Sequence, residues 1–99
     1  MIVVWGCIET TAEHVQQVLN LSLQHVHRSR TEPGCISHSA NIDAENPHRV
    51  VFFEEWENMD ALKTHFSVPA SSEFVNQVAR LSVSPPEIRA YTAEPVKLG

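Results

Sequence analysis

The segment from Arg49 to Glu57 carries large apolar side chains on both of its alternating faces. Phe52 lies on one face of a strand with a period of two residues, and Phe53 lies on the other. A strand that packs against a core on one side only has a polar second face. The pattern therefore predicts a strand that is covered on both sides, and the segment from Ile2 to Glu9 has the same property.

The remaining segments predict a regular order of strands and helices. We expect strands over Ile2–Glu9, Cys35–Asp43, Arg49–Glu57 and Glu87–Thr92, helices from Ala12 to about Arg30 and from Met59 to about Phe66, and a further helix that restarts at Ser71 or Ser72 after an interruption at Pro69. Thr11 and Asn58 are the expected helix caps, and Ala44–His48 is the expected hairpin turn. The order β-α-β-β-α-β predicts one α+β domain over residues 1–99, with a ferredoxin-like antiparallel sheet.

The helices of such a fold cover only one face of the sheet. The apolar residues on the other face would form a large patch in water, and such patches usually mark an interface. A second copy of the same sheet, related by a two-fold axis, is the simplest cover. We therefore expect a homodimer through the sheet faces, with local loops or the C-terminal tail as the alternative cover.

Charge and composition exclude several classes of partner. The net charge is −5 and the chain has only seven Lys and Arg residues, which argues against binding to nucleic acid or to an anionic membrane surface. No apolar run approaches the roughly 20 residues that span a bilayer, and the first residues do not resemble a signal peptide. We expect a cytoplasmic protein in which Cys7 and Cys35 are free, buried thiols.

Three short motifs carry a family resemblance. They are Glu32-Pro33-Gly34-Cys35 before a strand, Phe52-Phe53-Glu54-Glu55-Trp56 within a strand, and Ala61-Leu62-Lys63-Thr64-His65-Phe66 on a helix. At these spacings the chain resembles the antibiotic biosynthesis monooxygenase family from Met1 to about Thr92. The resemblance implies a dimeric α/β barrel with a pocket between the helices and the sheet of each subunit. It also implies a monooxygenase that uses no metal, flavin or haem.

Two histidines are the candidate catalytic residues. A neutral His65 could remove a phenolic proton, which makes an aromatic substrate electron-rich enough to react with oxygen. The alternative is an imidazole that bonds a backbone carbonyl or caps its helix. His38 lies on the apolar face of its strand, where it could anchor a substrate hydroxyl or serve only as a satisfied buried group.

Glu54 and four aromatic residues are the candidate substrate contacts. Glu54 shares a strand face with Phe52 and Trp56, so its carboxylate must find a partner or shift its pKa. It could orient His65 or a ligand, although we favour a structural ion pair with Arg49, Arg80 or Arg89, or a dimer contact. Phe52, Trp56, Phe66 and Phe74 could form the wall of an aromatic pocket, or could simply be core residues.

The six histidines do not predict a metal site. His25 and His27 are two positions apart on a helix and diverge, and no His-x-x-x-His pair or carboxylate cluster appears. The sequence also has no phosphate-binding or dinucleotide-binding motif. We therefore expect a site without metal or cofactor.

The sequence favours a cofactor-independent monooxygenase that oxidises a phenolic, quinol or polyketide-like aromatic substrate. Two alternatives remain open because this fold hosts several functions. One is an isomerase of a small polar metabolite, and the other is a non-catalytic stress-response or binding dimer. A pocket too small for a ligand, or histidines that point outward, would favour the non-catalytic alternative.

Overall fold

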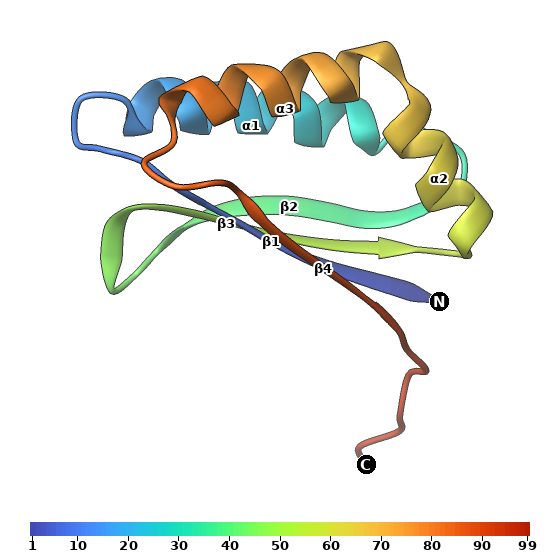
Figure 1. Ribbon diagram of the computed structural model, residues 1–99. Helices are drawn as coiled ribbons and strands as arrows, with labels where there is room; N and C mark the ends of the chain where they lie inside the picture. Colours follow the sequence, from blue (N-terminus) through green and yellow to red (C-terminus); the bar gives the residue numbers. More distant parts are fainter.

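A four-stranded antiparallel sheet with three helices on one face forms the protein (Figure 1). The computed structural model describes residues 1–99. The elements are β1 (Ile2–Glu9), α1 (Val15–Ser29), β2 (Cys35–Asp43), β3 (Asn46–Trp56), α2 (Met59–Ser67), α3 (Pro69–Leu81) and β4 (Glu87–Thr92), and the strand order is β2-β3-β1-β4. The predicted α+β class and ferredoxin-like topology are confirmed. None of the helices has the length and apolar character that crossing a membrane requires.

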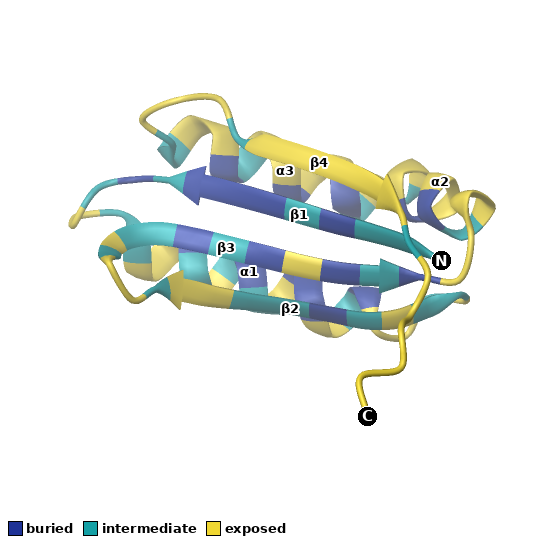
Figure 2. Cartoon of the chain, turned by 90° about the horizontal axis from the view of Figure 1, so that it is seen from below, coloured by how far each residue is buried: buried dark blue, intermediate teal, exposed yellow.

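The core lies between the sheet and the helices. One alternating face of β1 and β3 is buried there, with Val4, Val50 and Trp56 each at 0% exposure (Figure 2). From the helices, Val18 and Leu62 close the core at 0% exposure. Burial of these apolar side chains is the main stabilising contribution in a domain of this size.

The N-terminal ends of two helices differ from prediction. Helix α1 begins at Val15 rather than Ala12, and the Thr11 hydroxyl makes no capping bond and has no hydrogen-bond partner. The predicted interruption is present but falls at Val68, which is extended, and α3 begins at Pro69 rather than at Ser71 or Ser72. Proline suits that position because its fixed φ is helical and the first-turn N–H groups have no partner within the helix. The predicted Asn58 cap is confirmed, since its side chain accepts a hydrogen bond from Ala61 N at 2.9 Å.

The edge strand β2 departs from the simple alternation that predicted its inward face. Its pairing with β3 shifts register between Cys35 and Ser37, so Ile36 is exposed while His38 is buried. An inserted residue of this kind redirects the side chains that follow it. The hairpin to β3 is also tighter than predicted, because the strand resumes at Asn46.

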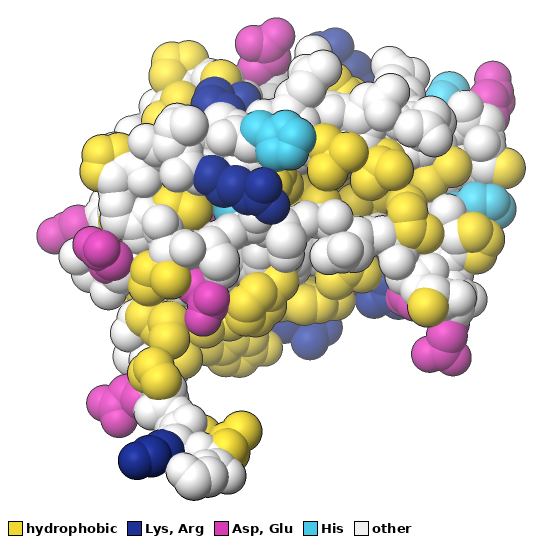
Figure 3. All heavy atoms as spheres, turned by 180° about the vertical axis from the view of Figure 1, so that it is seen from behind, with side chains coloured by type: hydrophobic (Ala, Val, Ile, Leu, Met, Phe, Trp, Pro, Cys, Tyr) yellow, Lys and Arg dark blue, Asp and Glu magenta, His cyan; other side chains and the backbone are white.

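The sheet face away from the helices keeps an apolar surface. Phe53 pairs with Trp5 across β3 and β1, and its side chain is 44% exposed (Figure 2). Trp5 is flanked by Arg49 and Arg89, whose guanidinium carbons lie 6.0 and 5.0 Å from the ring centroid. In the space-filling view from behind, hydrophobic side chains show along part of the lower edge of the molecule (Figure 3). Neither the loops nor the tail buries Phe53, so the alternative cover within the chain is wrong.

Candidate functional site

A cavity of about 210 Å³ lies between the helices and the sheet. Its lining is mainly apolar and comes from β1, β3, β4, α2 and α3, while His25, Glu54, His65, Ser71 and Glu87 are its polar or charged members. Binding sites for small molecules commonly combine such an apolar wall with a few convergent polar groups. The location agrees with the pocket that the family resemblance implies.

The turn before β2 places a carboxylate beside this cavity. Gly34 has a φ of 83°, which side-chain-bearing residues rarely adopt, and a Cβ there would lie 2.5 Å from the Cβ of Ala61. The glycine therefore lets the turn pack directly against the first turn of α2. This close approach brings Glu32 to His65, which follows Ala61 by one helical turn.

Two contacts, one with a carboxylate and one with an aromatic ring, hold the His65 side chain in place. Its Nδ1 lies 2.5 Å from Glu32 Oε1, and its ring lies 4.6 Å from that of Trp56 between centroids. A carboxylate accepts the Nδ1 proton, so the neutral ring carries its lone pair on Nε2. The side chain is 2% exposed yet lines the cavity.

Glu54 lies between His38 and Trp56. Its Oε1 accepts a hydrogen bond from Trp56 Nε1 at 2.9 Å and lies 3.2 Å from His38 Nε2. Burial alone would raise the pKa of Glu54, but the contacts with His38 and the indole N–H hold that pKa below its usual value. The carboxylate is therefore ionised at neutral pH. The predicted ion pair with an arginine is wrong, because the imidazole and indole groups are nearer on the same sheet face.

His25 is the member of the site that sequence reasoning missed. Its ring stacks on Phe74 with centroids 4.2 Å apart, and Arg28 Nη2 lies 2.7 Å from its Nδ1. Burial, together with neighbouring His38, His65 and Arg28, lowers the pKa of His25 to about 3. The signal lay in the helical repeat, because His25 follows the buried residues Val18 and Ser22 at seven and three positions.

The other predicted site residues fall into two groups. Phe52, Glu54, Phe66 and Phe74 line the cavity with His65. His38 and Trp56 do not line it and lie behind its wall, where both are almost fully buried. The structure thus places His38 and His65 in one cluster, with ring centroids 5.7 Å apart, although only His65 reaches the cavity.

Both cysteines are free thiols, as predicted; Cys7 is buried and lines the cavity, but Cys35 is only half-buried, so its predicted full burial is wrong. Burial raises the pKa of Cys7, in spite of a contact at 2.9 Å from Arg49 Nε to its Sγ. Burial also raises the pKa of Cys35. A raised pKa keeps a thiol protonated and therefore weakly nucleophilic.

Comparison with known families and proteins decides the classification. The family model described as antibiotic biosynthesis monooxygenase matches residues 1–77. The chain belongs to this family. An uncharacterized Synechocystis protein is 39% identical over 90 residues, which cover 91% of this chain and 61% of that protein. The chain therefore spans about three fifths of the length of this relative.

Solved structures with the same fold superpose on most of this chain. A candidate antibiotic biosynthesis monooxygenase from Deinococcus radiodurans is 26% identical, with a TM-score of 0.94, covering 100% of this chain and 99% of its own. A conserved protein from Methanosarcina mazei is 25% identical, with a TM-score of 0.88, covering 94% of this chain and 92% of its own. These similarities confirm the resemblance that the three motifs predicted.

Proposed function

We propose that this protein is a monooxygenase that oxidises an aromatic substrate bearing a hydroxyl group, such as a phenol, a quinol or a polyketide-like aromatic. Membership of the antibiotic biosynthesis monooxygenase family supports the reaction class. The observation that carries the proposal is the pair of His65 and Glu32 at the wall of an apolar cavity.

His65 serves as the general base. Its Nε2 lone pair receives the proton of a substrate hydroxyl, and the Glu32 carboxylate stabilises the imidazolium that forms. The resulting aryloxide is electron-rich and passes electrons to molecular oxygen. One oxygen atom enters the substrate, the other leaves as water, and the substrate supplies all four electrons of the reduction.

The cavity wall supports an aromatic substrate. Phe52 and Phe74 line it from the sheet and from α3, and their rings make an edge-on contact with centroids 6.0 Å apart. Aromatic rings favour such offset or edge-on neighbours. His38 is a positioning residue in this scheme, because it contacts Glu54 and lies behind the wall.

The two rival functions receive less support from this geometry. An isomerase of a small polar metabolite loses support where its substrate carries a phosphate, because a phosphate needs cations and the cavity lining contains no Lys or Arg. A non-catalytic dimer is expected to have a pocket too small for a ligand, or histidines that point outward. Here His25 and His65 both line a cavity of about 210 Å³.

We further propose that two copies associate through the exposed sheet face. The apolar surface around Phe53 and Trp5 supports this arrangement, since monomeric proteins rarely leave such a patch in water. Two sheets facing each other would form the dimeric barrel that the family resemblance implies.

The first test is oxygen uptake by the metal-stripped protein with a panel of hydroquinones and hydroxylated polycyclic aromatics. We expect turnover that falls roughly 100-fold or more in His65→Ala, which is the usual contribution of a general base. His27→Ala, an exposed histidine on α1, should leave turnover unchanged. Equal turnover in a folded His65→Ala protein would eliminate this mechanism.

A further inference from the structure

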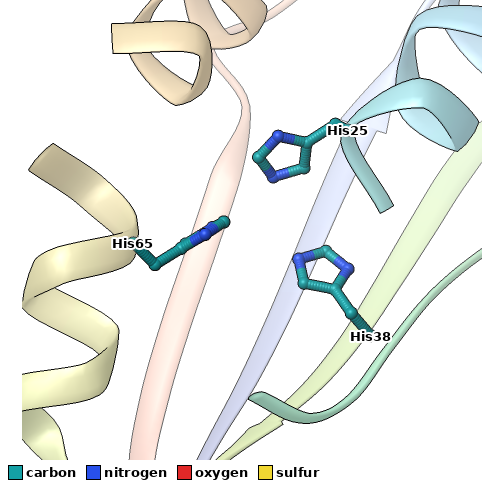
Figure 4. A group of neighbouring side chains, drawn as sticks. All are labelled: His25, His38 and His65. Atoms are coloured by element: carbon teal, nitrogen blue, oxygen red, sulfur yellow. The ribbon is translucent and has the colours of Figure 1, made fainter. Parts of the chain in front are cut away.

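Three buried imidazoles from three separate elements converge behind and beside the cavity. His25 comes from α1, His38 from β2 and His65 from α2, and one potential ligand atom of each lies within 4.8 Å of the others (Figure 4). Their exposed fractions are 6%, 2% and 2%. The three rings form a group of His, Cys, Asp or Glu side chains whose spacing could hold a metal ion, and they come from distant parts of the sequence.

Buried His38 has a ring nitrogen that a cation could bind. Its Nδ1 has no hydrogen-bond partner, and its Nε2 has only the 3.2 Å contact with Glu54 Oε1. An unsatisfied ring nitrogen in the interior is costly unless a ligand satisfies it. Two carboxylates, Glu32 and Glu54, lie at the cluster together with two guanidinium groups, because Arg28 contacts His25 and Arg30 donates to the backbone carbonyl of His38 at 2.9 Å.

The hydrogen bond between His65 and Glu32 resembles those that orient metal-binding histidines in other proteins. Histidines that bind a metal usually give their second N–H to a carboxylate, which fixes the ring and increases its basicity. Glu32 does this for Nδ1 of His65 and leaves Nε2 to bind. Metal binding and the general-base role proposed above use the same lone pair, so the base role belongs to the metal-free protein. Three imidazoles with the remaining positions open toward a cavity are the donor set of catalytic zinc centres.

We propose that His25, His38 and His65 bind one divalent first-row transition-metal cation of the zinc type, with its open position toward the cavity. Imidazole donors suit Zn²⁺, Co²⁺, Ni²⁺ and Cu²⁺ and do not suit Mg²⁺ or Ca²⁺. The facing nitrogens must move closer than their present spacing, since zinc–imidazole bonds are about 2.0–2.1 Å long. The sequence-based expectation of no metal site considered only neighbours along a helix and not this convergence.

The positive charge of Arg28 next to His25 should weaken metal binding, and this effect can be tested by substitution. Arg28 donates a hydrogen bond to Nδ1 of His25, which places the proton of the neutral ring on Nε2. Metal binding at Nε2 moves that proton to Nδ1, where it faces the guanidinium. Removing the charge of Arg28 should therefore strengthen metal binding, whereas a merely structural role of Arg28 predicts no gain.

The experiment is a Co²⁺ titration of the chelator-treated full chain, followed by visible absorption and by equilibrium dialysis. We expect one saturable Co²⁺ per chain, with the ligand-field absorption of an imidazole-bound ion, and its displacement by Zn²⁺. His25→Phe, His38→Phe and His65→Phe keep a ring in each position and should abolish this binding. His27→Phe, on the exposed side of α1, should retain it.

Arg28→Gln keeps all three imidazoles and should tighten Co²⁺ binding by roughly tenfold, the scale of effects from groups behind metal ligands. Absence of saturable binding in the native protein, or equal binding in the three histidine variants and His27→Phe, would overturn the proposal. Weaker binding in a folded Arg28→Gln protein would also contradict it. The measurement uses no substrate, so its failure is distinguishable from failure of the proposed oxidation.

Discussion

Individual buried histidines set the electrostatic character of this protein. His25 is the extreme case, because burial comes first among the causes that lower its pKa to about 3. The groups that face it are His38, His65 and Arg28, each of which disfavours its protonation, and Glu54, which favours it. The native ring is consequently neutral at any pH at which the protein is expected to work.

This low pKa predicts a loss of stability in mild acid. Unfolded His25 binds a proton below its ordinary pKa of 6.5, whereas the native ring does so only near 3. The unfolded state therefore holds more protons in this interval, and the free energy of unfolding falls as the pH falls. The contribution is about 1.4 kcal/mol per pH unit below the ordinary pKa.

The measurement is urea denaturation between neutral pH and about pH 5, compared with His25→Phe. The variant keeps the ring against Phe74 and should show a correspondingly shallower dependence on pH. The lowered pKa of Glu54 adds a loss of the same sign, but only below the ordinary carboxyl range. Identical pH dependence of the two proteins would show that native His25 is not protected from protonation.

At the scale of the elements, local patterns were enough for the strands but not for the site. The apolar, partly β-branched segment Ile2–Glu9 predicted the observed bounds of β1, and the segment Glu87–Thr92 after two prolines predicted those of β4. The contact between Glu32 and His65 joins a turn to a helix 33 positions away. No sequence period encodes such a contact, so the partner of the predicted base was found only in the structure.

Gly34 allows the turn to pack against α2 and so brings Glu32 to His65. Its replacement should lower the free energy of unfolding. Gly34→Ala would force a side chain into positive φ and place its Cβ against Ala61. We expect a destabilisation of about 2–4 kcal/mol from backbone strain and overpacking together. Oxygen uptake should fall as well, because Glu32 shifts away from His65.

Gly6→Ala is the matched control for thermal and urea denaturation. A Cβ at Gly6 would meet Phe52 Cβ at 3.5 Å, which is an ordinary contact, and its backbone has no positive φ. Its change in stability should stay within about 1 kcal/mol. If Gly34→Ala proved equally mild, the close approach of the turn to α2 would not be what holds Glu32 in place.

At the scale of the whole molecule, one face of the sheet packs against the helices and the other face is exposed. The helices close the core and the cavity, while the opposite sheet face remains apolar around Trp5 and Phe53. The doubled apolar pattern of β3 predicted this face directly from the sequence. It could not predict the position of the cavity, which depends on how α2 and α3 lie over the sheet.

The proposed dimer predicts that a charge on this face separates the two copies. Phe53→Arg would place a third guanidinium beside Trp5, where Arg49 and Arg89 already lie, and a charge without a partner is expensive to bury. Light scattering during gel filtration should give twice the chain mass for the native protein and the chain mass for Phe53→Arg. Val83→Arg changes a side chain that is also exposed but lies in the loop before β4, so it should remain dimeric. A native protein of single-chain mass across all concentrations would refute the dimer, while the cavity and the histidine cluster, which lie within one chain, would be unaffected.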